Sequence, residues 1–61
     1  MTPRQEAQDI AKQMQLANPT IKKTKEEGIS SAIVGLKYAI VFASIENKDH
    51  LKQVLEALYD L

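Results

Sequence analysis

A chain of 61 residues can form one small domain, and a domain of this size buries only about 60% of the surface of its extended chain. It has no cysteine, which excludes disulfides and thiolate metal ligands, and its single histidine, His50, argues against a structural metal site. Eight basic and eight acidic residues give a net charge of zero, so no overall field attracts the chain to duplex nucleic acid.

The N-terminal segment predicts a helix over residues 3–17. Thr2 is a good N-cap, Pro3 suits the first helical position, and Gln5 can complete a capping box. Small and apolar residues then recur every three or four positions, at Ala7, Ile10, Ala11, Met14 and Ala17. The helix is expected to end at "NPT", because a residue that precedes proline avoids the helical region.

A second helix is predicted over residues 25–45. Thr24 and Glu27 have the spacing of a capping box, and the acidic residues in the first turn suit the helix dipole. A start at Asn18 and Pro19 is the alternative, which would make residues 19–24 an extension of this helix instead of a turn.

The last helix is predicted over residues 47–60, with Asn47 as its cap. One face of it is apolar, at Leu51, Val54, Leu55, Leu58 and Leu61. The connection to the second helix is short, so these two helices should pack antiparallel. The expected fold is therefore all-α: a single domain over residues 1–61, made of a helical hairpin and an N-terminal helix.

The central helix carries more apolar surface than two neighbours can cover. Bulky side chains occupy two sides of it, and a third row is small: Gly28, Ala32, Gly35, Ala39 and Ala43. Such a row lets another helix approach closely. Either the first helix packs there, or a second copy of the chain does. We favour a homo-oligomer, a dimer or a higher ring, because a large exposed apolar patch marks an interface. The expected interface residues are Ala32, Gly35, Leu36, Ala39 and Ala43.

No pattern of residues indicates catalysis, a metal site or a cofactor. Glu46 lies one helical turn before His50, but no further metal ligand can be identified. We therefore expect a protein that is not an enzyme and that binds no metal or cofactor.

A lysine-rich segment suggests a site for an anion. Lys22, Lys23 and Lys25 flank Thr24 just before a helix N-terminus, where free N–H groups favour negative charge. The pair Lys37 and Tyr38 follows about three turns later. In an oligomer the lysines of one copy could meet the tyrosine of another and bind a nucleotide. The alternative is an ordinary solvated loop. The candidate ligand-binding residues are Lys22, Lys23, Thr24, Lys25, Lys37 and Tyr38.

The chain resembles a group of short proteins encoded by phages and prophages, whose function is uncharacterised. The matching stretches are "MTPRQEA", "SAIVGLKYAI" and "LKQVLEALYDL". Two departures stand out, because Ser31 replaces a cysteine of that group and Lys37–Tyr38 replaces an acidic pair.

This resemblance implies a phage protein that acts in the cytoplasm of an infected bacterium. Small phage proteins of this kind block host factors or trap nucleotide signals of antiviral defence. We therefore expect an oligomeric protein that sequesters a cyclic or linear nucleotide signal. The alternative is a protein-interaction module that inhibits or recruits a host or phage protein. The longest apolar run, residues 39–43, is far too short to span a membrane, so no membrane partner is expected.

Overall fold

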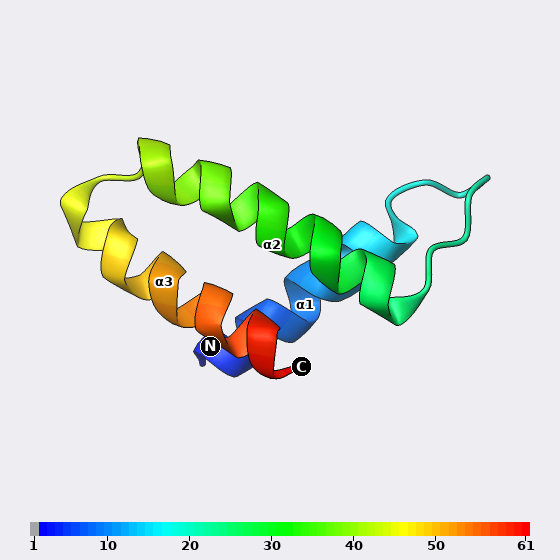
Figure 1. Cartoon of the computed structure of the whole chain (residues 1–61), viewed down its shortest axis with the longest axis horizontal. Helices are drawn as coiled ribbons and strands as arrows, with labels where there is room; N and C mark the ends of the chain where they lie inside the picture. Colours follow the sequence, from blue (N-terminus) through cyan, green and yellow to red (C-terminus); the bar gives the residue numbers. More distant parts are fainter. Residues whose placement is uncertain (1) are drawn as a thin grey trace.

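In a computed structural model, which describes residues 2–61, the chain folds into three helices without a strand (Figure 1). They are α1 (Pro3–Leu16), α2 (Lys25–Phe42) and α3 (Ile45–Asp60). α2 and α3 diverge from the short turn that joins them, and α1 lies across the open end of this hairpin (Figure 1). Each helix contacts the other two. The all-α prediction is confirmed for this part of the chain.

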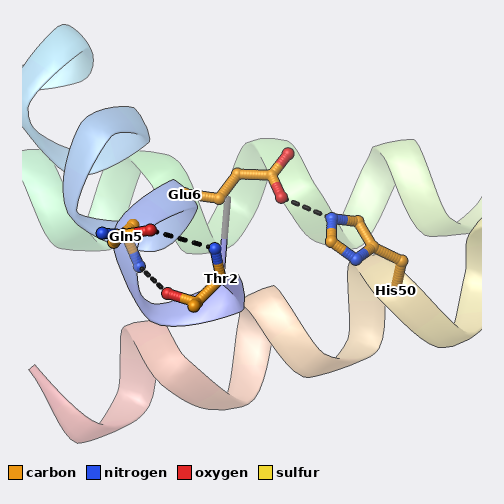
Figure 2. Close-up of polar contacts among 4 residues, drawn as sticks. All are labelled: Thr2, Gln5, Glu6 and His50. Atoms are coloured by element: carbon orange, nitrogen blue, oxygen red, sulfur yellow. Dashed lines mark hydrogen bonds and ion pairs between the residues drawn. The ribbon is translucent and has the colours of Figure 1, made fainter.

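Two capping boxes fix the starts of α1 and α2. The Thr2 hydroxyl accepts a hydrogen bond from the Gln5 N–H at 3.2 Å, and the Gln5 side chain accepts one from the Thr2 N–H at 3.1 Å (Figure 2). Thr24 and Glu27 repeat the arrangement, at 3.2 Å and 2.9 Å. Each box satisfies two N–H groups that a helix start would otherwise leave unpaired. The helices begin where these boxes place them.

The turn between α2 and α3 lies earlier than predicted. α2 ends at Phe42 rather than at residue 45, because Ala43 and Ser44 have extended backbones with ψ angles of 152° and 161°. Ser44 is the N-cap of α3, and Asn47 lies in its first turn with its N–H donating to the Ser44 carbonyl at 3.1 Å. Ser44 and Asn47 are both common caps, so the sequence offered two starts for this helix.

Residues 17–24 connect α1 to α2 without helical structure. α1 ends at Leu16, one residue before the predicted end. The Asn18 side chain then accepts hydrogen bonds from the Thr20 N–H at 3.0 Å and from its hydroxyl at 2.6 Å. This local bonding is typical of a turn. Residues 19–24 thus belong to the connection and do not extend α2.

The hydrophobic core is small and contains many alanines. Within the described residues, the buried hydrophobic side chains are Ala7, Ala11, Ala32, Leu36, Val54 and Leu58. Partly buried aliphatic residues from all three helices surround them. Half of the core positions are thus alanine, and only Val54 and Leu58 are bulky side chains that are fully enclosed.

α1 crosses α2 at the first residues of the small row. A Cβ atom added to Gly28 would lie 2.7 Å from the Ala11 carbonyl oxygen and 2.9 Å from the Gln15 Cβ atom. Ala32, one turn further, is also buried. α1 therefore packs on the beginning of the small row. This is the first of the two alternatives that the sequence left open. No helix in the part of the chain that the structure covers is long and apolar enough to cross a membrane.

Candidate interaction surface

A stripe of large apolar side chains lies uncovered on α2 and at the start of α3. Its members, with the exposed fraction of each, are Val34 (54%), Tyr38 (68%), Val41 (68%), Phe42 (85%) and Ile45 (86%). The spacings of four, three, one and three residues place the members on α2 on one side of that helix. That side is opposite Leu36, which points into the core. We call these five residues the exposed stripe.

The rest of the small row lies beside the exposed stripe and is also uncovered. Gly35 and Ala39 are both exposed. Within the described chain, nothing lies within 4 Å of the position that a Cβ atom on Gly35 would take. A ridge of bulky side chains therefore runs next to a row of small residues on the same free surface. Helices pack by inserting ridges of this kind between the side chains of a partner helix.

The exposed stripe carries no charge of its own. Between Gly28 and Ile45 the sequence has a single charged residue, Lys37. Its ammonium group lies over the ring of Tyr59 on α3, 5.9 Å from the ring centroid, where the π face attracts a cation. Lys37, Val34, Tyr38 and Val41 line a shallow, mostly apolar depression. A partner for this surface must therefore bring apolar side chains rather than a counter-charge.

The residues predicted for the oligomer interface divide into two groups. Ala32 and Leu36 are only 1% and 6% exposed, so they belong to the internal core and cannot line a surface between copies. Gly35 and Ala39 are exposed and Ala43 is half-buried. The structure leaves these three available. The predicted interface did not include the bulky residues of the exposed stripe, although the spacing of those on α2 places them on one side of that helix.

The residues predicted to bind a nucleotide lie at two distant places. Lys22, Lys23, Thr24 and Lys25 precede or begin α2, whereas Lys37 and Tyr38 lie about 13 residues along, or roughly 20 Å at 1.5 Å per residue. Lys23 donates a hydrogen bond to the Ser31 hydroxyl at 3.3 Å. Thr24 is engaged in its capping box. A single copy thus does not assemble these six residues into one site.

Carboxylate side chains of α2 itself already lie at its N-terminus. The Glu27 carboxylate accepts the hydrogen bond of the Thr24 N–H, and Glu26 adds a second negative charge in the same turn. The bond from the Thr24 backbone lowers the pKa of the Glu27 carboxyl, and the Thr24 hydroxyl and the charge of Lys23 act in the same direction. An incoming phosphate would compete with these carboxylates for the helix dipole.

The lowered pKa of Glu27 predicts a specific dependence of stability on pH. Its contribution is complete above the ordinary pKa of a glutamate in the unfolded chain and is lost as the pH falls through the lower pKa of the folded state. Glutamine can make the same capping bond without a charge, as Gln5 does in α1. The difference in melting temperature between the native chain and Glu27→Gln should therefore shrink between pH 5 and pH 2.5.

Glu26→Gln is the matched control, because it removes the same charge from the same turn without touching the capping bond. Its difference from the native chain should change less over this range. Equal behaviour of the two variants would show that the capping bond does not set the pKa of Glu27.

One polar contact joins residues far apart in the sequence. The Nε2 atom of His50 on α3 contacts the Glu6 carboxylate on α1 (Figure 2). Its partner is therefore not Glu46, which lies one helical turn earlier in the sequence. Both side chains are partly exposed, so the pair adds at most about 1 kcal/mol of stability. Among residues 2–61 no group of three or more side chains could hold a metal ion. We interpret the pair as a link between two helices.

Comparison of the chain with protein-family models, with curated proteins and with solved structures finds no match. The resemblance to short phage proteins stays a prediction.

Proposed function

We propose that this chain is a non-catalytic interaction module whose partner at the exposed stripe is a second copy of itself. The observation that carries the proposal is the exposure of five large apolar side chains along one side of α2 and at the start of α3. Contiguous apolar surface of this kind marks an interface in proteins that work in water. The module acts as a homo-oligomer, with a dimer as its basic unit.

The size of the exposed stripe supports a stable contact. The exposed parts of its five side chains amount to on the order of 700 Å², against roughly 800 Å² on each partner in a standard interface. Because the core is small, this contact also adds stability to the fold. Domains shorter than about 70 residues rarely gain more than 3–5 kcal/mol from one core, and many of them are completed by oligomerisation.

The charge pattern favours a second copy over a charged partner. The exposed stripe has no ionised side chain, so two copies meet without repulsion. An anionic membrane or a polyanion would need a cluster of basic residues there, and Lys37 is the single basic residue in α2 beyond its first turn. Two copies therefore cover each other's exposed stripe, because the two apolar surfaces are identical and a two-fold axis relates them.

The substitution Val41→Asp tests this proposal. A carboxylate in the middle of the interface would be buried without a partner, which should weaken the dimer at least about tenfold. The readout is the dissociation constant, obtained by light scattering over a range of concentrations. Gln13→Asp is the matched control, because it adds the same charge at an exposed position in the last turn of α1, as Val41 lies in the last turn of α2. Equal dissociation constants for the two variants would refute the proposed surface.

Sequestration of a nucleotide signal is the second candidate function. Tyr38 offers an exposed ring and Lys37 lies beside it, while Lys22 and Lys25 are also exposed. An oligomer that brings the lysine segment of one copy to Tyr38 of another would combine charge with a stacking surface. The resemblance to phage proteins favours this kind of ligand.

Calorimetry with a panel of cyclic and linear nucleotides tests the second candidate. This candidate predicts heat of binding for one class of nucleotide, no degradation of it, and loss of the heat in Lys22→Ala. A panel without any heat would exclude sequestration and leave the interaction module in place, since the dimer does not depend on a ligand.

A further inference from the structure

We infer that the second copy packs on the exposed stripe with its α2 running antiparallel, so that a two-fold axis passes close to Tyr38. The inference rests on the proposed self-association and adds the geometry of the contact. It follows from three features of the free surface: its uneven bulk, its limits along α2, and the direction of the helix dipole.

The first feature is the uneven bulk along the exposed stripe. Phe42 and Ile45, the most exposed members at 85% and 86%, lie at one end. The other end has less bulk, because Val34 is 54% exposed and Gly35 beside it has empty space around its Cβ position. An antiparallel pair places the bulky end of each copy against the open end of the other. A parallel pair would place Phe42 against its own equivalent and leave the two glycines facing an unfilled space.

The second feature is the length of α2 that remains free. On the side of α2 that carries the exposed stripe, the residues that precede Val34 are polar (Glu27, Ser30 and Ser31), so the apolar surface does not continue toward the start of the helix. The free segment extends from Val34 to Phe42, where α2 ends. Tyr38 is the midpoint of this segment. A two-fold axis at the midpoint overlaps the two free segments completely, whereas any other position leaves part of each free segment uncovered.

The third feature is the helix dipole. α2 has no basic residue in its last turn to offset the partial negative charge of its C-terminal carbonyl groups. A parallel pair would bring two such ends together. An antiparallel pair sets the end of each helix beside the middle of the other. Bulk, length and dipole therefore favour the same arrangement.

Cross-linking of single-cysteine variants tests this arrangement, because the native chain has no cysteine. In the antiparallel pair Val34 of one copy faces Phe42 of the other. The two Val34 residues lie about 12 Å apart along the axis, beyond the limit of about 7 Å between Cα atoms joined by a disulfide. We expect an oxidised mixture of Val34→Cys and Phe42→Cys to give mainly the mixed dimer, identified by intact mass. Each variant alone should stay largely unlinked.

Tyr38→Cys, near the axis, should link to itself, and Gln13→Cys, on the exposed side of α1, should not. If Tyr38→Cys weakens the dimer, the mixed experiment still decides, since both of its partners keep Tyr38. Self-linked dimers of Val34→Cys and of Phe42→Cys would overturn the antiparallel arrangement and show a parallel one. A chain that scatters light as a monomer would instead overturn the proposed self-association, so the two failures are distinguishable.

Discussion

Replacing Leu58 by alanine should leave much of the chain unfolded. Leu58 is 1% exposed and is one of the two bulky side chains that the core encloses fully. Removing a buried leucine to its Cβ atom costs about 2–5 kcal/mol, which approaches the 3–5 kcal/mol that a core of this size supplies. The alanine side chains of the core are too short to fill the cavity. Urea unfolding followed by circular dichroism measures the loss.

Leu16→Ala is the control for this prediction. Leu16 lies at the end of α1 and is 66% exposed, so its removal costs little burial and should barely move the urea midpoint. Both variants should be measured at one protein concentration, since self-association adds to apparent stability. A Leu58→Ala variant that unfolds at the same urea concentration as Leu16→Ala would contradict the position of the core described above.

Alanine in place of Gly28 and alanine in place of Gly35 should change stability in opposite directions. A methyl group on Gly28 would lie 2.7 Å from the backbone oxygen of Ala11, so α1 must shift, and overpacking of this kind costs typically about 1–3 kcal/mol. Gly35 has open space around it, so alanine there should add up to about 1 kcal/mol through helix propensity. Both glycines lie in α2, and the two substitutions are chemically identical.

The difference between these variants is best measured in the Val41→Asp background, where the proposed dimer is weakened and each midpoint reports on one copy. Thermal unfolding in this background should place Gly35→Ala above the parent and Gly28→Ala well below it. Two variants of equal stability would show that α1 does not cross α2 at Gly28, and the free half of the helix would then have to be assigned again.

The local signals in the sequence predicted the helices well. Thr2 with Gln5, and Thr24 with Glu27, have the residue types and the spacing of a capping box, and both boxes form. The start of α3 was harder to predict, because Ser44 and Asn47 can both serve as caps. The apolar residues around Ser44 also continued the pattern of the second helix, which extended the prediction past its end at Phe42.

Contacts between helices could not be read from the sequence in the same way. The small row is continuous along α2, yet α1 covers Gly28 and Ala32 and leaves Gly35 free, because the crossing angle of two helices depends on all of their side chains. For the same reason Ala32 and Leu36 were expected at a surface between copies and lie in the core instead. His50 contacts Glu6, which lies 44 residues earlier in the chain, and no pattern in the sequence predicts this contact.

The claim on which the proposed function depends is that the exposed stripe is covered by a second copy of the chain. Sedimentation equilibrium of the native protein, from low micromolar to near millimolar concentration, tests it most directly. The account predicts a mass that rises to at least twice the 6.8 kDa of one copy. A mass that stays at 6.8 kDa over the whole range, for a chain that remains folded, would contradict it.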